Sequence, residues 1–277
     1  MSLPFKSALI TGASAGIGKQ YAIELAKAGT SELFLLARRT ERLAALCDEL
    51  DKLTEGKVKT QLITCDLLDA AQRKEVIQRF RAPEIHLDLL VNNAGFGSVG
   101  RFDKLDWQRQ SDMVNLNCTA LAHLAHGIIP GMAARGRGTI INVASTAAFQ
   151  PLPFMSTYGA TKAFVFSLSL ALWAEYRRSG VHSIVHCPGP TESEFHIAAG
   201  LNDKIDLLTP MPTAPVVIEA LQAAAGKRTV IVNGTQNRAM AFLTRFVPYS
   251  LLARIVAYKL GPYRGVGEPQ AVAKQRQ

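Results

Sequence analysis

The sequence predicts an α/β protein of the doubly wound class, in which a parallel sheet of seven strands carries helices on both faces. Seven short apolar or β-branched runs recur along the chain, and longer helical patterns separate them. The composition agrees, because 48% of the 277 residues are hydrophobic and 19% are charged, as in an ordinary globular protein. No composition break divides residues 1–234, so we expect one domain there, followed by a basic amphipathic appendage over residues 235–277.

The expected elements follow in chain order. The strands are Ser7–Thr11, Leu33–Ala37, Val58–Thr64, Leu87–Asn92, Thr139–Val143, Val181–Cys187 and Thr229–Val232. The first crossover helices are Gly16–Ala28, Thr40–Leu53, with Thr40 as a candidate cap, and Asp69–Phe80, which begins with a residue that favours a helix N-terminus. Two longer helices, Asp106–Ala134 and Thr157–Ser179, carry apolar residues on more than one face, so they should pack against something besides their own sheet.

The distribution of charge argues against a nucleic-acid-binding protein. Of the net charge of +9, residues 235–277 contribute +6, because seven basic residues there face a single acidic one. The main body is therefore nearly balanced, and no basic groove interleaved with aromatic residues is visible in it. We expect no nucleic-acid partner.

Cysteine and histidine spacing predicts no metal site. The four cysteines lie far apart, as expected for free thiols in a reducing compartment, and His123 and His126 lack a third ligand in any obvious motif. No apolar run reaches the roughly 18 residues that a membrane-spanning helix needs, and no signal segment precedes the first strand. The expected location is cytoplasmic.

A glycine-rich turn connects the first strand to the first helix. In Thr11–Gly18, glycines at positions 12, 16 and 18 permit a tight turn and a close backbone approach. The following helix N-terminus can bind an anion, so the phosphates of a dinucleotide are the natural ligand, although close packing alone could also explain the glycines. The spacing resembles the Thr-Gly-x-x-x-Gly-x-Gly signature of the short-chain dehydrogenase/reductase family.

Further elements of that family's pattern follow in order. They are Asn92–Gly95 after the fourth strand, Asn117 on the next helix, Ser145 after the fifth strand, Tyr158 with Lys162, and Pro188–Gly189 after the sixth strand. One match could arise by chance, but the ordered set spans residues 11–189. The resemblance implies a doubly wound, Rossmann-like fold with a nicotinamide dinucleotide cofactor.

Tyr158 and Lys162 stand four residues apart, hence on one face of a helix. An ammonium beside a phenol favours the phenolate, so we expect Lys162 to draw the Tyr158 pKa from about 10 towards working pH. Tyr158 can then protonate a carbonyl oxygen as hydride reaches its carbon.

The resemblance implies roles for the remaining residues. Lys162 would also hold the nicotinamide ribose, Ser145 would bond the substrate oxygen, and Asn117 would join a water-linked proton relay. Each residue alone has an ordinary structural explanation; the set at these spacings does not. The other cofactor-binding residues that it implies are Gly12, Ser14, Gly16, Ile17, Gly18, Asn93, Ala94, Gly95, Pro188, Gly189 and Thr191.

The end of the second strand predicts NADP as the cofactor. NAD-preferring folds place a carboxylate there for the ribose 2′-hydroxyl, whereas this chain has Ala37 followed by Arg38 and Arg39. Guanidinium groups suit a 2′-phosphate, although solvated arginines at a strand end are the plain alternative. Asp66 resembles the family's adenine-contacting acid, and it could instead cap a helix.

The segments expected to line the substrate site are mostly apolar. They favour a lipophilic ketone or secondary alcohol, such as a 3-oxoacyl chain or a cyclic or steroid-like ketone. A nucleotide-sensing protein without turnover is the competing function. The candidate lining residues are Phe149, Leu152, Phe154, Phe195 and Ile197, beside Ser145 and Tyr158.

Two expectations concern partners. In the resembling family the two long helices form subunit contacts, so we expect a homo-oligomer, either a dimer or a tetramer. Residues 239–260 set an apolar stripe among arginines and a lysine, with Pro248 dividing them into two short helices. This stripe either docks over the substrate cleft or a neighbouring subunit, or it contacts a membrane surface.

Overall fold

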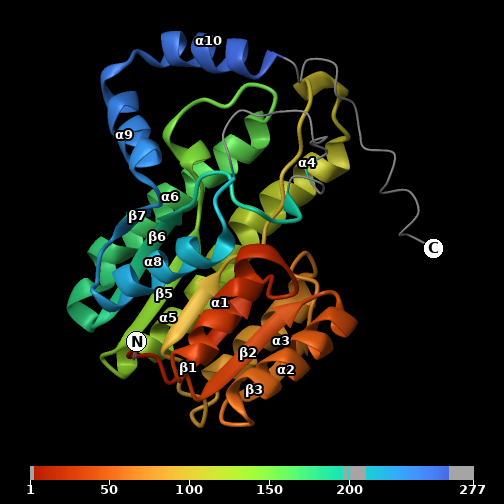
Figure 1. Ribbon diagram of the computed structural model, residues 1–277, viewed down its shortest axis with the longest axis vertical. Helices are drawn as coiled ribbons and strands as arrows, with labels where there is room; N and C mark the ends of the chain where they lie inside the picture. The colour runs from red at the N-terminus through yellow and green to blue at the C-terminus, as the bar shows by residue number, and fades with distance from the viewer. Residues whose placement is uncertain (1–2, 196–198, 200–209, 262–277) are drawn as a thin grey trace.

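The computed structural model describes residues 3–195, 199 and 210–261, and its centre is a parallel sheet of seven strands. The strand order is β3-β2-β1-β4-β5-β6-β7, which confirms the doubly wound class (Figure 1). The strands are β1 (Ser7–Thr11), β2 (Glu32–Ala37), β3 (Lys59–Thr64), β4 (Leu89–Asn92), β5 (Gly138–Val143), β6 (Val181–Cys187) and β7 (Val230–Val232).

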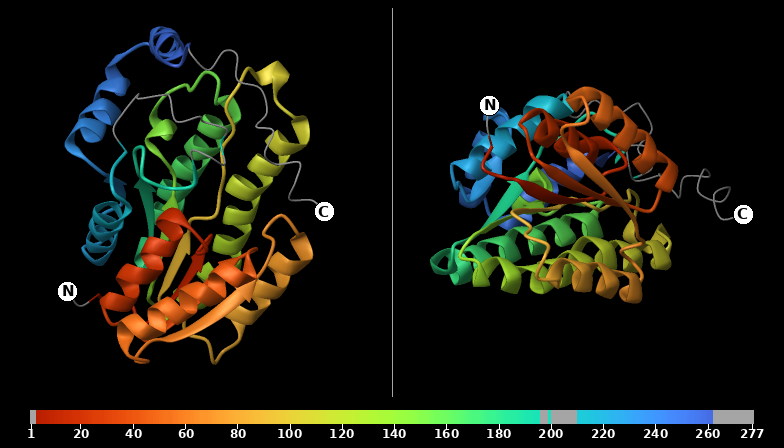
Figure 2. Two further views of the ribbon diagram at one scale, coloured as in Figure 1. Left: turned by 45° about the vertical axis from the view of Figure 1, so that its right-hand side comes forward. Right: turned by 90° about the horizontal axis from the view of Figure 1, so that it is seen from below.

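Helices cover both faces of the sheet (Figure 2). The helices α1, α2 and α8 pack on one face, where a cluster of buried Leu, Ile, Val and Ala side chains forms half of the core. A second cluster lies on the other face, beneath α3 and α5. The helices are α1 (Gly16–Lys27), α2 (Thr40–Thr54), α3 (Ala70–Arg81), α4 (Trp107–Val114), α5 (Leu121–Ala134), α6 (Ser156–Tyr176), α8 (Thr213–Ala225), α9 (Thr235–Leu243) and α10 (Tyr249–Lys259).

The sheet topology determines where a ligand can bind. Strand β1 pairs with β2 on one side and with β4 on the other. Strands β2 and β3 therefore extend the sheet to one side of β1, and β4 to β7 extend it to the other side. The loops that leave β1 and β4 therefore separate, and they leave a crevice at the carboxyl ends of the strands. All the predicted cofactor segments follow these carboxyl ends.

The structure corrects three details of the predicted helices. A π-helical turn, Asn115–Ala120, separates α4 from α5 within the range expected to be one helix. Thr40 is the first residue of α2 rather than its cap, and its hydroxyl lies 2.8 Å from that of Thr64. Helix α8, in the crossover to β7, was not predicted. The predicted role of Asp69 is confirmed, because its carboxylate accepts from two backbone N–H groups in the first turn of α3.

Helices α9 and α10 lie beyond the carboxyl ends of the strands (Figure 1). Pro248 separates them, with a short 3₁₀ turn before it, so the expected division of this segment into two helices is confirmed. Residues 262–277 of the expected appendage lie outside the described residues. None of the described helices is long and apolar enough to cross a membrane.

A buried polar chain ties α1, β6 and the end of β7 together. The Tyr21 hydroxyl lies 2.8 Å from His186 Nδ1, and His186 Nε2 lies 2.7 Å from Asn233 Oδ1. The Asn233 amide nitrogen donates to Val216 O and to Glu219 Oε2, so its oxygen must accept a proton from His186. Burial lowers the pKa of His186 to about 4, which keeps the ring neutral with Nδ1 as the acceptor for Tyr21.

Candidate active site

The glycine-rich turn after β1 has the backbone geometry that its glycines were expected to permit. Gly12 and Gly16 have φ values of +67° and +53°, in the left-handed region that favours glycine. A Cβ atom on Gly18 would lie 2.3 Å from Gly12 O, so only glycine allows α1 to start this close to the strand. Ser14 and Ile17, both half-buried, complete the turn.

Hydrogen bonds attach this turn to the loop after β4. The Thr11 hydroxyl accepts from the backbone N–H groups of Asn93 (2.9 Å) and Ala94 (3.0 Å). The Asn93 side chain in turn donates to Thr11 O at 3.0 Å. The predicted Asn92–Gly95 segment therefore holds the two sides of the crevice at a fixed separation.

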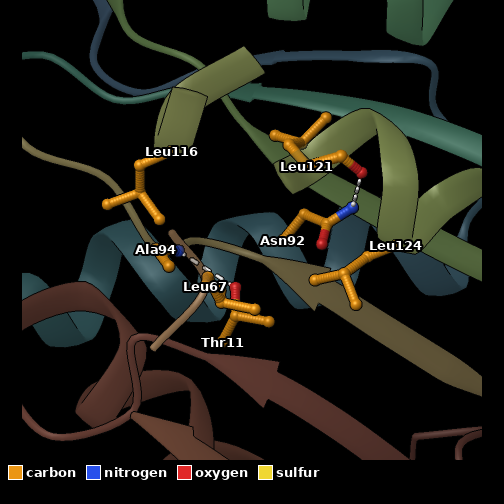
Figure 3. A pocket seen from close by; sticks show the side chains of 7 residues that line it. All are labelled: Thr11, Leu67, Asn92, Ala94, Leu116, Leu121 and Leu124. Atoms are coloured by element: carbon orange, nitrogen blue, oxygen red, sulfur yellow. Dashed lines mark hydrogen bonds between the residues drawn. The ribbon is translucent and has the colours of Figure 1, made fainter. Parts of the chain in front are cut away.

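A small pocket lies directly beneath this connection (Figure 3). Thr11 and Asn92 point into it from the strands, and Leu67 and Ala94 from the loops that follow β3 and β4. Leucines from the start of α5 and the π-helical turn before it close the opposite side. The crevice thus has an apolar floor beside Asp66, the residue before Leu67.

Arg39 is held between the glycine-rich turn and the segment after β6. Its Nε and Nη2 atoms donate to the Ser14 hydroxyl at 3.3 and 3.2 Å, and its Nη1 lies 3.1 Å from Glu194 Oε2. Arg42, one turn along α2, contacts the other carboxylate oxygen of Glu194. Hydrogen bonds from Arg42 and then Arg39 lower the pKa of Glu194, so this residue is an anion.

Neither Glu194 nor Arg42 was predicted. Arg42 could have been found from its position three residues after Arg39, on the same side of a helix. Glu194 lies in a segment without periodicity, and only the fold brings it to the arginines. Arg38, the other predicted phosphate ligand, is 67% exposed, and its Nη1 lies 3.8 Å from Asp66 Oδ2.

The loop after β6 reaches the same crevice. Pro188 O accepts from Thr146 N at 2.9 Å, and the Thr191 hydroxyl donates to Gly189 O at 2.9 Å. A Cβ atom on Gly189 would lie 2.3 Å from the Asn237 amide nitrogen, so this glycine allows α9 to pack against the loop. The three predicted cofactor residues of this loop therefore stand opposite the glycine-rich turn, where Ser193 lies against Gly16.

Tyr158 and Lys162 occupy the first two turns of α6 and face inward together. Their side chains are 8% and 6% exposed. Lys162 Nζ lies 5.7 Å from the centroid of the Tyr158 ring and donates to Val143 O at 2.8 Å. Burial lowers the pKa of Lys162 to about 8, so its ammonium titrates far below an exposed lysine.

The pKa of Tyr158 moves in the opposite direction from the one expected. Burial raises it to about 12, and the hydrogen bond with Ser145 offsets only part of that rise. The expectation of a lowered phenol pKa is wrong for this structure, because burial is the dominant cause and raises the pKa. Tyr158 is therefore a protonated phenol at neutral pH.

Ser145 connects β5 to this site. Its backbone is extended, and its hydroxyl oxygen accepts from Ala147 N at 3.1 Å, so it caps the short helical turn Thr146–Phe149. A hydrogen bond between Ser145 and Tyr158 lowers the pKa of the phenol. The predicted pair of Ser145 and Tyr158 is thus brought together.

Asn117 lies in the π-helical turn and is 1% exposed. Its Oδ1 accepts from Phe96 N at 3.1 Å, and its Nδ2 donates to Phe96 O and to the Thr161 hydroxyl, each at 3.0 Å. The side chain thus fixes the loop after β4 to α6, between Tyr158 and Lys162. Single π-helical turns often occur at functional sites. Thr161, the residue that completes this link, was not predicted.

An apolar cluster surrounds the Tyr158 ring. Phe195 packs on it with a centroid distance of 5.2 Å. Phe154, whose φ of +65° is a strained value for a bulky residue, packs instead against a neighbouring cluster around Val99 and Leu252. Phe149 is not part of the Tyr158 cluster, because it packs against Phe166 in a different one. Ile197 lies outside the described residues. The other members of the Tyr158 cluster are Phe96, Met113, Ala147, Leu152 and Met155.

The comparison with protein families agrees with this geometry. Residues 6–203 match the family described as short chain dehydrogenase. A very-long-chain 3-oxoacyl-CoA reductase of Ajellomyces capsulatus is 31% identical over 264 residues, 92% of this chain and 72% of that protein. A hydroxysteroid dehydrogenase-like protein 1 of Gallus gallus is 34% identical over 176 residues, 63% of this chain. The match covers 52% of the Gallus protein, so the chain spans about half the length of that relative.

Solved structures share the whole architecture. A short-chain dehydrogenase from Sphingobium yanoikuyae in complex with NADPH has a TM-score of 0.78 and 31% identity, covering 95% of this chain and 98% of that one. A bulky-bulky ketone specific alcohol dehydrogenase from Comamonas testosteroni has a TM-score of 0.75 and 32% identity, covering 87% and 92%. The chain therefore belongs to the short-chain dehydrogenase/reductase family of oxidoreductases.

Proposed function

We propose that this protein is an NADPH-dependent reductase of lipophilic ketones. The observation that carries the proposal is a protonated Tyr158 phenol, bonded to Ser145, within an apolar cluster. A neutral phenol is the form that donates a proton, so the raised pKa favours reduction of a carbonyl over oxidation of an alcohol. The named relatives that reduce 3-oxoacyl-CoA or bulky ketones support the same substrate class.

The residues of the crevice fit a nicotinamide dinucleotide. The positive φ values of Gly12 and Gly16 open the helix N-terminus towards a pyrophosphate. A Cβ atom on Gly95 would lie 2.8 Å from Asn117 Oδ1, so the glycine lets the loop after β4 pass close to Asn117, beside the Lys162 ammonium. Asp66, half-buried after β3 at the same edge of the sheet, is the candidate contact for adenine.

The chemistry then follows from the site. When bound, NADPH supplies a hydride to the carbonyl carbon. Ser145 and Tyr158 hydrogen-bond the carbonyl oxygen, and Tyr158 transfers its proton to that oxygen as the new C–H bond forms. The product is a secondary alcohol, and the buried Lys162 ammonium stabilises the phenolate left behind. Asn117 fixes the loop after β4 to α6, and we propose that the proton relay that returns a proton from solvent to Tyr158 passes this turn.

The site also supports a preference for NADPH. Ala37 stands where a carboxylate would bind the ribose of NAD, and Arg38 and Arg39 follow it; Arg39 already donates to Ser14 in the turn. A 2′-phosphate near Ser14 would receive charge-assisted hydrogen bonds from these guanidinium groups. A nucleotide-sensing protein is the second candidate, and the same arginines would serve it.

We expect NADPH to bind about tenfold or more tightly than NADH, a difference of about 1.4 kcal/mol. Arg38→Asp should reverse the preference, because its carboxylate repels the phosphate and accepts from the ribose hydroxyl. Fluorescence titration with both cofactors measures this, with Arg81→Asp on the far side of the sheet as a matched charge control. Equal affinities for the two cofactors would refute the assignment.

The same enzyme, given a panel of 3-oxoacyl, cyclic and steroid-like ketones, should consume NADPH with at least one of these classes. Loss of NADPH absorbance follows the reaction. NADPH binding without turnover on any of these ketones would instead favour the sensing protein.

We also propose that the protein is a homo-oligomer that associates through α6. Phe164 is exposed on this helix, and Phe166, Leu170 and Trp173 are half-buried. We expect light scattering at micromolar concentration to give at least twice the chain mass of 30.0 kDa, because a second copy would cover these partly exposed apolar side chains. A mass of one chain, unchanged in Phe164→Glu, would contradict this proposal.

A further inference from the structure

The solvent-facing side of α9 and α10 is unusually apolar. Among the described residues, thirteen large hydrophobic side chains are exposed, and seven of them lie within residues 242–258. We call these seven the outer face; Phe246, Tyr249 and Tyr258 are its most exposed members, at 71%, 74% and 85%. A monomeric protein in water rarely gathers so much apolar surface in one place. The outer face consists of Phe242, Leu243, Phe246, Tyr249, Leu251, Ile255 and Tyr258.

The opposite side of α10 is buried. Leu252, Val256 and Leu260 are at most 9% exposed, and they form a cluster with Val99. Phe154, Phe195 and Met155 are packed against this cluster, and the last two also pack beside Tyr158. Helix α10 is therefore apolar on both sides, and its packing onto the domain does not account for the outer face. Its inner side meets the apolar end of the active site.

The cations beside the outer face have no acidic counterparts. Arg245, Arg254 and Lys259 are exposed, and residues 235–260 contain no Asp or Glu. In the part of the chain that the structure describes, no carboxylate forms a salt bridge with these three residues. Arg238 differs, since it lies 3.5 Å from Glu219. The surface thus combines exposed aromatic and aliphatic side chains with unpaired positive charge.

Charge decides what can cover this surface. A symmetric dimer through the outer face would bring each cation near the same cations of a second copy, with no carboxylate on the face to separate them. A membrane that contains anionic lipid supplies negative headgroups for the cations and an acyl boundary for the apolar residues. Tyr249 and Tyr258 carry a hydroxyl on an apolar ring, which suits the headgroup level.

We propose that the outer face of α9 and α10 binds the surface of a membrane containing anionic lipid. The helices lie on the lipid rather than cross it. Delivery of substrate rests on the proposed function. Helix α10 lies between the lipid and the apolar cluster at Tyr158, so a lipophilic ketone dissolved in the membrane is close to the site. Binding to lipid itself is independent of the reaction.

Flotation of the full chain with vesicles tests the proposal. We expect the protein to float with phosphatidylcholine vesicles containing about 30% phosphatidylserine, and only weakly with pure phosphatidylcholine. Arg245→Gln/Arg254→Gln/Lys259→Gln should weaken binding about 10²-fold, because each basic residue near an anionic surface contributes about fivefold. Raising the salt concentration should weaken wild-type binding in the same direction.

Two variants distinguish lipid binding by the outer face from nonspecific binding by exposed aromatic residues. Phe246→Ser/Tyr258→Ser should abolish flotation, whereas Phe102→Ser/Trp107→Ser, which removes two exposed aromatic residues elsewhere, should leave it unchanged. Turnover of a water-soluble ketone, measured without vesicles, should be equal in both variants. Failure of wild type to float with anionic vesicles at low salt, or equal loss of flotation in the two variants, overturns the proposal. Absence of turnover with flotation intact would count against the reaction alone.

Discussion

Tyr158→Phe is expected to lower the turnover of a ketone about 10²–10⁴-fold, the usual contribution of a positioned general acid. The substitution removes one oxygen from a ring that Phe195 and Met155 keep in place, so the protein should fold normally. Affinity for NADPH should stay nearly unchanged, because the proton is needed only when the carbonyl oxygen gains charge. Single-turnover absorbance and fluorescence titration measure the two quantities separately.

Tyr176→Phe provides the matched control, since it makes the same change at the far end of the same helix. It should retain turnover close to wild type. If Tyr158→Phe kept more than about a tenth of wild-type turnover, another group would have to supply the proton, and the assignment of the general acid would be wrong.

Lys162→Met is expected to weaken NADPH binding about tenfold and also to lower turnover about 10²-fold. Methionine keeps most of the buried stem but removes the ammonium, which bonds Val143 O and is free on its other N–H groups to bond a ribose. The double effect distinguishes this residue from Tyr158, whose loss affects turnover alone. An intact affinity for NADPH in this variant would remove the ribose role.

The pH dependence of kcat/KM tests the same residue. Burial lowers the pKa of Lys162 to about 8, so the ammonium is present below that pH and is lost as pH rises through it. Wild-type kcat/KM should therefore decline above about pH 8, because this ratio reports groups of the free enzyme. The decline should be absent in Lys162→Met. The same decline in the variant would assign it to another group.

The fold could be predicted because its main signals are local. Each strand is a short apolar run followed by a turn, and Asp69 caps α3 as its position indicates. The π-helical turn at Asn117 could not be read from periodicity, since one extra residue in a turn changes the apolar spacing very little. Helix α8 was missed because its first half contains Val and Ile, which are β-branched and more typical of strands than of helices.

The positions of the site residues could be predicted, whereas the properties that depend on side-chain packing could not. Tyr158 and Lys162 share a helix face by their spacing, whereas Ser145 was implied by the resemblance to the family. The pKa of Tyr158 was mispredicted, because it depends mainly on burial, which the spacing of Tyr158 and Lys162 does not show. Phe149 was assigned to the substrate site on its character, but the short turn that Ser145 caps directs it towards Phe166.

The buried chain of Tyr21, His186 and Asn233 restricts which sequences this fold can accept. Each proton in this chain has one acceptor. Replacing a single member therefore leaves a buried partner without its hydrogen bond, which lowers the free energy of unfolding by about 1–3 kcal/mol. An apolar residue in place of His186, for example, becomes tolerable once Tyr21 has lost its hydroxyl and Asn233 its amide. Tyr21 and Asn233 lie 165 and 47 residues from His186 in sequence, and we expect all three residues to change together. The interior of the sheet thus limits substitution at these positions independently of the reacting groups.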